Sequence, residues 1–255
     1  MKKIVSLSIA VFLMLIATIN LTYAQEEKNE QLYYGWEETV KPEHLNEYIE
    51  LSQELVELCK QEKFSLTFYT WWVRPMVCQL WYPITSLNDI ESINNEWDKL
   101  LEKWGEEKYA AFNNTKMHNN RLTCIDKKEL EFIPQNPDCT IDDIIYELGR
   151  EIYLKPGKQN EFEEALKWLN EKRRELDFKT YVFYLEGKIG YEDPCSIILY
   201  GAANKLQLLE QNAAYTEEYL KVFQEYLDRI YPLMRSSKVF DWNYEKNLSY
   251  IPADE

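Results

Sequence analysis

The sequence predicts an α+β protein that contains one folding unit twice. Two observations support this prediction. Residues 152–162 have the pattern of a strand end, a Lys-Pro corner and a helix start, and residues 38–48 carry an earlier copy of that pattern. After each copy, runs typical of strands and apolar stripes at helical spacing follow in the same order. Each unit is therefore expected to run strand, helix, strand, strand, helix, strand.

The repeat is visible residue by residue. When the sequence is aligned with itself at a shift of 114 positions, several residues match identical residues. The first such pair is Gly35 and Gly149, and the last is Phe64 and Phe178. Farther along, a shift of 119 aligns Leu80 with Leu199 and Leu87 with Leu206, which places five extra residues of the second copy near 186–194. At the ends, a shift of 118 aligns four more identical pairs: Lys128, Leu130, Ile133 and Pro134 with Lys246, Leu248, Ile251 and Pro252.

Local signals give the bounds of the elements. In the first copy we expect strands at 32–40, 64–73, 76–84 and 122–126, helices at 42–63 and 86–105, a shorter helical piece to 116, and a polar loop at 117–121. Ser86 is the predicted N-cap of the second helix. In the second copy we expect strands at 144–154, 178–185, 195–201 and 239–244, and helices at 156–176 and 205–234 with a break near 215. The predicted organisation is repeat 1 at 32–134, a linker at 135–143 and repeat 2 at 144–252.

The order of elements in each copy is the split βαβ, or ferredoxin-like, pattern. Helices cover one face of such a four-stranded sheet, and the other face stays bare unless something packs on it. Two copies in one chain can solve this problem together. We therefore expect the two bare faces to meet as an intramolecular α+β barrel.

The start of the second unit also resembles a known superfamily. The residues that carry the resemblance are Tyr146, Leu154, Lys155, Pro156, Gly157, Lys158, Glu161 and Phe162. They look like the start of the dimeric α+β barrel superfamily, especially its NIPSNAP-like and antibiotic-biosynthesis-monooxygenase-like domains. The first copy departs from the pattern, with Glu43 and Tyr48 in place of the Gly and the Phe. The resemblance implies the fold, and its members include cofactor-free oxygenases, haem-degrading enzymes and isomerase-like proteins.

Residues 1–24 have the form of a cleavable secretory signal peptide. Lys2 and Lys3 precede an apolar run, which ends at Thr22-Tyr23-Ala24. An uncleaved membrane anchor is the alternative, because the run is nearly long enough to span a bilayer. We expect cleavage, a frayed tail at 25–31, and a periplasmic or secreted protein without stable membrane insertion. Loss of the two lysines would change the net charge from −15 to −17, which disfavours nucleic acid as a partner.

The five cysteines show neither a CxxC motif nor metal-ligand spacing. Cys78 and Cys195 fall in predicted strands, where buried thiols are common. In an oxidising compartment Cys124 and Cys139 are the first candidate pair for a disulfide, although sequence does not fix the connectivity.

Alternation along the strands identifies candidate catalytic acids. Glu37 and Glu151 are equivalent in the two copies, and both are expected to face the barrel interior together with Tyr153. Two carboxylates in a partly dry barrel could act as acid and base in a cofactor-independent oxygenase or isomerase. The alternative, which we favour, is that these acids pair with Arg74, Arg121 or Arg150 or lie at a wet mouth.

The aromatic content is the other unusual feature, with 8 Trp, 19 Tyr and 10 Phe. Most of these rings are expected to fill the core. Those in the hairpins and on the inner face are candidates for binding a flat apolar, aromatic or sugar-like ligand, namely Trp71, Trp72, Trp81, Tyr153, Tyr181, Phe183 and Tyr200. Our leading functional hypothesis is a non-catalytic binding or interaction protein of the bacterial envelope.

Histidine offers little chemistry here. His44 is expected to be exposed on the first helix, and His118 lies in the predicted polar loop. Related haem enzymes use a helix histidine as iron ligand, which makes His118 a minor candidate that a Soret band lost on His118→Ala would reveal. We expect no cofactor and no metal site, and the sequence leaves open whether the chain forms a homodimer.

Overall fold

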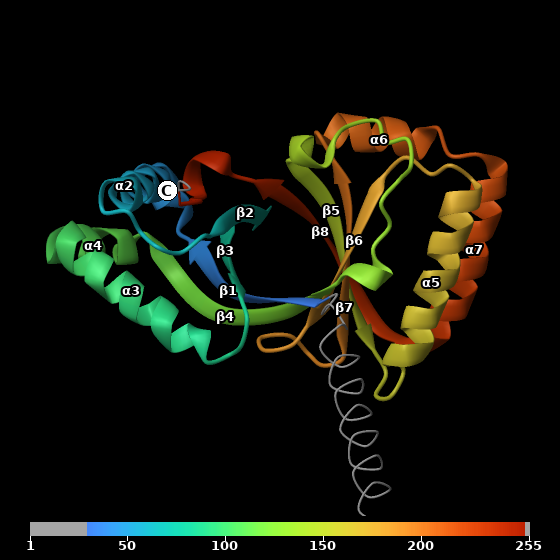
Figure 1. The fold of residues 1–255 in the computed structure, drawn as a ribbon, viewed down its shortest axis with the longest axis horizontal. Coiled ribbons are helices and arrows are strands. Elements are labelled where there is room, and N and C mark those ends of the chain that lie inside the picture. The colour runs from blue at the N-terminus through green and yellow to red at the C-terminus, as the bar shows by residue number, and fades with distance from the viewer. Residues whose placement is uncertain (1–29, 253–255) are drawn as a thin grey trace, which may run out of the picture. The chain divides into compact units, whose positions relative to one another are not determined.

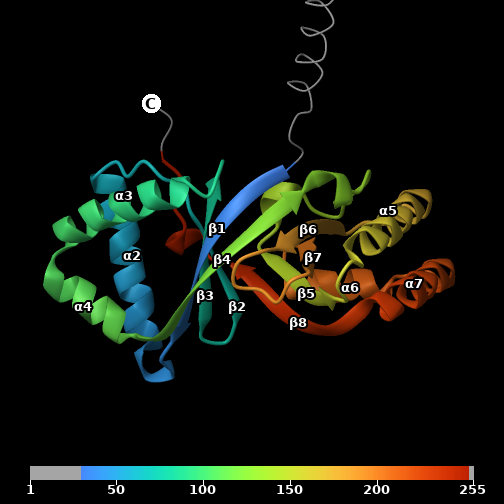
Figure 2. The same ribbon diagram turned by 90° about the horizontal axis from the view of Figure 1, so that it is seen from below.

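Eight strands close into a barrel, and helices cover it on two sides (Figures 1 and 2). The computed structural model describes residues 30–252. The predicted signal peptide and most of the predicted tail lie outside the described residues. Within the described part of the chain, no helix is both long and apolar enough to cross a membrane. The predicted α+β class and the barrel are confirmed.

The elements follow one another in the expected order. The strands are β1 (Glu30–Val40), β2 (Tyr69–Arg74), β3 (Val77–Ile84), β4 (Lys116–Lys127), β5 (Tyr146–Leu154), β6 (Tyr181–Gly187), β7 (Cys195–Ala202) and β8 (Met234–Tyr244). The helices are α2 (Leu45–Gln61), α3 (Asp89–Trp104), α4 (Glu106–Asn114), α5 (Gln159–Glu175), α6 (Lys205–Ala213) and α7 (Glu217–Ile230). Single 3-10 turns lie at Pro42–His44, Lys128–Leu130, Ile141–Asp143, Tyr231–Leu233 and Lys246–Leu248.

Strand order explains how equivalent positions meet. Around the barrel the strands run β1-β3-β2-β8-β5-β7-β6-β4, and β4 closes onto β1. Each neighbour from β1 to β5 in this order is antiparallel to the one before it. Strands β1 and β5 therefore run in the same direction on opposite walls, so equivalent residues of these two strands lie at the same end of the barrel.

Three large apolar clusters hold the described part of the chain together, with a small fourth one of Tyr146, Ala202 and Leu208. One lies between the sheet β1-β3-β2 and the helices α2, α3 and α4, and a second lies between the sheet β8-β5-β7-β6 and the helices α5 and α7. The third fills the barrel and draws side chains from all eight strands. At its centre Trp81, Ile197 and Trp242 are each at most 5 % exposed. Burial of this much apolar surface from both halves stabilises the barrel as one unit.

The pairing of residues between neighbouring strands corrects one part of the sequence alignment. Gly35 pairs with Trp81, and Gly149 pairs with Leu199, so Trp81 corresponds to Leu199 at a shift of 118. The shift of 119 proposed for this hairpin was wrong by one residue. In a strand such a slip exchanges the two faces, and Leu80 indeed faces the helices whereas Leu199 faces the interior. In this alignment the connection between β6 and β7 is therefore four residues longer than the one between β2 and β3.

Two strands are longer than predicted. The predicted loop 117–121 is part of β4, and β8 begins at Met234 rather than at residue 239. Both misplaced stretches are polar, and most of their side chains are exposed. Sheet hydrogen bonds join backbone groups, so a solvent-facing strand needs no apolar alternation. Conversely, β2 begins at Tyr69, because residues 64–67 have no ladder partner.

The helix cap and the disulfide also differ from expectation. Helix α3 has Asn88 at its N-cap without a side-chain bond, whereas the Asp89 carboxylate accepts hydrogen bonds from the backbone of Thr85 and Ser86. Every cysteine is a free thiol, so no bond joins Cys124 to Cys139. Cys78 and Cys195 are fully buried, as predicted for core thiols.

A close backbone approach inside the barrel gives a stability prediction. A Cβ at Gly35 would lie 2.6 Å from Cζ3 of the buried Trp81 ring. Gly35→Ala is expected to lower the free energy of unfolding by about 2 kcal/mol through overpacking, as measured by urea denaturation. In the Trp81→Leu background, where the ring is gone, the same change should cost much less. Equal costs in both backgrounds would show that this contact does not limit the packing.

Candidate functional site

The predicted acids Glu37 and Glu151 lie at one mouth of the barrel, on opposite walls. Glu37 accepts a hydrogen bond from Gln79 Nε2 at 2.7 Å and lies 3.8 Å from an Arg74 guanidinium nitrogen. Gln79 in turn accepts from the Trp81 indole at 3.1 Å, which links Glu37 to the barrel interior. Glu37 is therefore paired with Arg74, as the favoured alternative in the sequence analysis predicted.

Glu151 has a different set of partners. It accepts a hydrogen bond from the Tyr153 hydroxyl at 2.6 Å, and Lys238 Nζ donates to the same hydroxyl at 3.3 Å. The ammonium of Lys238 also lies over the Tyr153 ring. The two acids therefore share an end of the barrel but hold separate networks.

Tyr191, from the loop between β6 and β7, packs against the barrel cluster at this mouth. Gly187 is the point of closest approach, where a Cβ would lie 2.8 Å from the Tyr191 ring. Burial raises the pKa of Tyr191 well above its ordinary value, and surrounding groups that include Glu151 and Glu37 act in the same direction. A neutral phenol thus lies near both acids.

The predicted aromatic residues divide between two environments. Trp71, Trp81, Tyr153 and Phe183 belong to the cluster inside the barrel, and Tyr181 stacks on Phe183 at 6.2 Å between ring centres. Trp72 and Tyr200 instead pack against the helix-side clusters. The interior rings contact one another, as in the pair Trp71 and Trp242 at 5.6 Å, so they serve as core.

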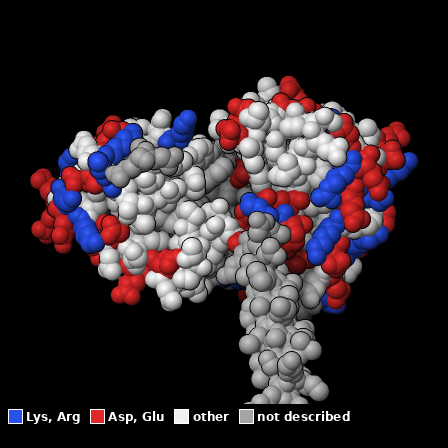
Figure 3. Space-filling view, viewed as in Figure 1, with Lys and Arg blue, Asp and Glu red and all other residues white. Residues whose placement is uncertain are grey.

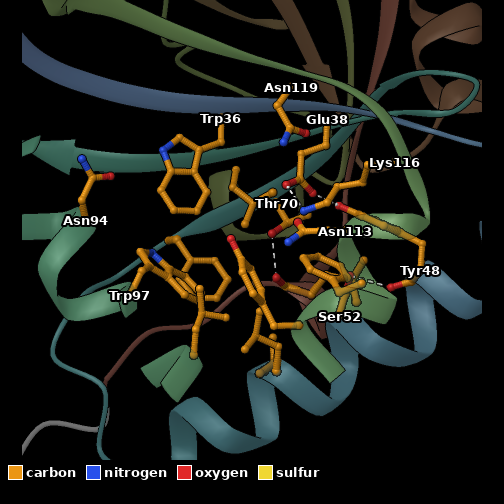
Figure 4. Close-up of a pocket in the computed structure, with 18 of the residues that line it drawn as sticks. Trp36, Glu38, Tyr48, Ser52, Thr70, Asn94, Trp97, Asn113, Lys116 and Asn119 are labelled. Atoms are coloured by element: carbon orange, nitrogen blue, oxygen red, sulfur yellow. Dashed lines mark hydrogen bonds and ion pairs between the residues drawn. The ribbon is translucent and has the colours of Figure 1, made fainter. Parts of the chain in front are cut away.

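A cavity of about 410 Å³ lies between the first sheet and the helices α2, α3 and α4, and we call it the helix-side pocket (Figure 4). Its volume falls in the range usual for small-molecule sites. Figure 4 shows Trp36 and Trp97 on one side of the pocket and Glu38 with Lys116 on the other. The two indole rings lie 5.7 Å apart and form an apolar wall.

The opposite wall is a buried polar network. Lys116 Nζ lies 2.9 Å from one carboxylate oxygen of Glu38, and the Tyr48 hydroxyl donates to the other at 2.7 Å. Both charged side chains are only 7 % exposed. The Lys116 ammonium also lies 3.9 Å from the centre of the Phe112 ring. A buried pair of this kind is costly to break, because either charge alone would be left without compensation.

Three carboxamides complete the lining of the helix-side pocket. They belong to Asn94 on α3, Asn113 on α4 and Asn119 on β4. Within residues 30–252, none of these side chains takes part in a hydrogen bond, although each can donate and accept. The pocket therefore offers free hydrogen-bonding groups opposite an aromatic wall.

The remaining predicted candidates stand apart from this pocket. His118 is exposed on β4, and the His44 side chain is 39 % exposed and bonded to Glu47. Among the described residues, no group of three or more His, Cys, Asp and Glu side chains could hold a metal ion.

A second acidic group occupies the other end of the barrel. Lys128 Nζ lies 2.5 Å from Asp126 and 3.2 Å from Glu131. Burial, and then the Asp126 carboxylate, raise the pKa of Glu131 to about 7. Burial, and then the charge of Glu131, raise the pKa of Glu147 to about 8. Glu147 is only 5 % exposed and accepts no hydrogen bond from a described residue.

Comparison with solved structures identifies the fold. An anthrone oxidase-like protein superposes with a TM-score of 0.54 at 12 % identity, covering 86 % of this chain and 92 % of its own. A proposed monooxygenase of Fusobacterium nucleatum gives 0.52 at 14 % identity, covering 85 % and 93 %. A chlorite dismutase variant of Candidatus Nitrospira defluvii gives 0.50 at 9 % identity, covering 86 % and 92 %.

The chain has the α+β barrel fold of these proteins. At such low identities the likeness establishes the fold alone. No protein-family model matches the sequence, and no curated protein matches it either.

Sequence reasoning missed the polar wall of the helix-side pocket. Tyr48 is identified from the sequence as the residue in place of the Phe of the superfamily pattern, and Lys116 is placed at the end of a helical piece. The available signal was Glu38, which alternates with Trp36 and Val40 on the face of β1 that packs under the helices. A lone acid on a buried face needs a partner, but its partner lies 78 positions away.

The raised pKa values predict how stability depends on pH. Between about pH 5 and pH 8 the unfolded chain has lost the proton that the folded protein keeps on Glu147, so raising the pH favours unfolding. We expect the free energy of unfolding to fall by on the order of 3 kcal/mol over this range. In Glu147→Gln, whose amide resembles the neutral acid, the fall should be much smaller. Urea denaturation at several pH values measures both slopes, and identical slopes would refute this assignment.

Proposed function

We propose that the protein is a non-catalytic binding protein whose ligand occupies the helix-side pocket. The observation that carries this proposal is the set of Asn94, Asn113 and Asn119 carboxamides, which face the pocket without intramolecular partners. Asn94 and Asn119 are exposed and Asn113 is half-buried, so their amide groups are open to a ligand that enters from solvent. The indole N–H groups of Trp36 and Trp97 in the same lining are buried without a partner among the described residues. Buried polar groups in proteins are usually satisfied, so this lining favours an external partner. The barrel interior is a poorer candidate because its aromatic residues pack against one another.

The lining favours a flat neutral ring with an apolar face and polar edges. The Trp36 and Trp97 rings can cover the apolar face, and the carboxamides can exchange hydrogen bonds with hydroxyl groups at the edge. The charges of Glu38 and Lys116 satisfy each other, so they add polar contacts without selecting a net charge. A sugar ring has this combination of properties.

Binding of ring sugars tests the proposal directly. Hexoses and N-acetylated hexosamines should quench tryptophan fluorescence, whereas the open-chain alditols should not. Asn113→Ala should weaken binding about tenfold, which corresponds to one lost hydrogen bond. Asn46→Ala, on an exposed position of α2 outside the pocket, serves as the matched control. Binding that is equal for rings and alditols, or equal in both variants, would contradict a sugar site here.

A cofactor-independent oxygenase or isomerase is the second candidate. It is supported by the fold shared with an anthrone oxidase-like protein and a proposed monooxygenase, and by the presence of Glu37, Glu151 and Tyr191 at one mouth. Glu151 would serve as the base and the neutral Tyr191 phenol as a proton donor.

Turnover of an anthrone or a quinol under air tests this candidate. Glu151→Gln should abolish oxygen uptake while the circular dichroism spectrum stays unchanged. Glu164→Gln, at an exposed position of α5, should retain full activity. If the wild-type protein consumes no oxygen, or if Glu151→Gln is fully active, the second candidate fails.

Two further parts of the proposal concern origin and location. We propose that the chain arose by duplication of one ferredoxin-like unit. Constant shifts of 114 before the β6–β7 loop and 118 after it support this origin. We also propose that the protein is exported to the periplasm or beyond, which rests on residues 1–24 of the sequence. Pairing of two barrels into a homodimer remains part of the proposal.

A further inference from the structure

The second half of the molecule buries an arginine without an acid. Arg173, on the inner face of α5, is fully enclosed. Its guanidinium donates to the Asn170 side chain at 2.7 Å and to the Tyr200 hydroxyl at 3.2 Å, and Nε has no partner. Its planar group also lies near the Phe178 ring. All of these partners are neutral, so the positive charge is not compensated by any residue in the described part of the chain.

A cavity of about 300 Å³ lies beside this arginine, beneath α7, and we call it the α7 cavity. Most of its lining is apolar, with Ile152, Ile198 and Phe223 among the walls. Leu220 and Val239 belong to the lining and are more than half exposed, so the cavity opens to solvent beside them. The α7 cavity is separate from the helix-side pocket, which lies in the other half of the molecule.

One wall of the α7 cavity is polar. Tyr200, Tyr219 and Tyr226 line it, and the Tyr200 hydroxyl accepts a hydrogen bond from Arg173, which does not itself line the cavity. The Tyr226 hydroxyl is buried and has no partner. Arg150 lines the cavity itself and forms no ion pair with any described residue. Arg150 and Tyr226 thus share the lining of the α7 cavity. Burial raises the pKa of Tyr226, and the positive charges of Arg173 and Arg150 act in the opposite direction.

A fully buried arginine without an acidic partner is unexpected in this chain. It carries 44 acidic and 29 basic residues, and Figure 3 shows acidic and basic side chains interspersed over the helices α5 and α7. Isolated charges in an apolar interior are strongly disfavoured. An anion in the α7 cavity would offset that cost, because attraction between opposite charges is strong where water is excluded.

We propose that the α7 cavity binds a medium-chain carboxylic acid, with its alkyl chain along the apolar walls and its carboxylate at Arg150 and the Tyr226 hydroxyl. Arg173 acts from behind the tyrosines as a fixed positive charge. The apolar lining excludes small free anions such as acetate, since these would lose hydration without burying an apolar chain. Uncharged lipids of the same length lack the group that the arginines attract.

Calorimetric titration of the full chain with decanoate, decanol and acetate tests this proposal. Decanoate should bind at least tenfold more tightly than decanol, and acetate should show no binding. Arg150→Met and Tyr226→Phe should each weaken decanoate binding about tenfold and leave decanol binding unchanged. Tyr231→Phe, at an exposed tyrosine next to α7, is the matched control and should bind decanoate like the wild type.

The choice of variants keeps the proposal open to refutation. Arg173 itself is enclosed, so its replacement risks loss of the fold, whereas Arg150 lines an open cavity and the Tyr226 hydroxyl has no bond to lose. Circular dichroism verifies that each variant is folded. Equal affinity for decanoate and decanol, no binding of either, or a carboxylate preference that survives in both variants would overturn the proposal.

Discussion

Closure of eight strands around a filled interior is the constraint on which the rest of the structure depends. Each half contributes four strands, and neither four-stranded sheet could leave its inner face in water without exposing rings such as Trp81 and Trp242. When the two faces meet, these rings contact each other at 6.3 Å. The inner faces are thereby used for packing, and space for ligands remains on the outer faces, beneath the helices.

Because the inner faces are filled by packing, the polar groups lie at the ends of the barrel and beneath the helices. Acids lie at the two ends of the barrel: Glu37 lies 3.8 Å from Arg74 at one end, and burial raises the pKa of Glu147 at the other. Beneath the helices, the two halves solve the problem of buried charge differently. The first half pairs Glu38 with Lys116, so its pocket is nearly neutral. The second half surrounds Arg173 with tyrosines and an asparagine, so its cavity keeps a positive charge. The two halves of the barrel thus offer two cavities of different chemistry.

Sequence patterns predicted much of this fold because the decisive signals are local. The Lys-Pro corners at Lys41 and Lys155 mark the start of each first helix region, and period-2 alternation placed Tyr153 inside the barrel. The hairpin register was one residue off because loop length, not side-chain identity, sets it, and the extra loop residues around Tyr191 lie between the aligned segments. The strand ends at 117–121 and 234–238 escaped detection because backbone pairing does not require apolar side chains.

The candidate sites were harder to predict because their residues meet only in three dimensions. Glu38 and Lys116 are far apart in sequence, and β1 must close onto β4 before they pair. Arg173 did leave a signal, since Phe162, Leu166 and Leu169 form a helical stripe that continues at this position. A charged residue within an apolar stripe can mark a buried site, but its lack of an acidic partner is visible only in the fold.

Xenon binding tests the central claim most directly, because xenon enters apolar cavities and not filled cores. We expect crystals of the protein under xenon pressure to show density in the α7 cavity, next to Phe223. We expect none between Trp81 and Trp242 inside the barrel. Density between those two rings would show that the interior is hollow. The barrel interior would then be a candidate ligand site.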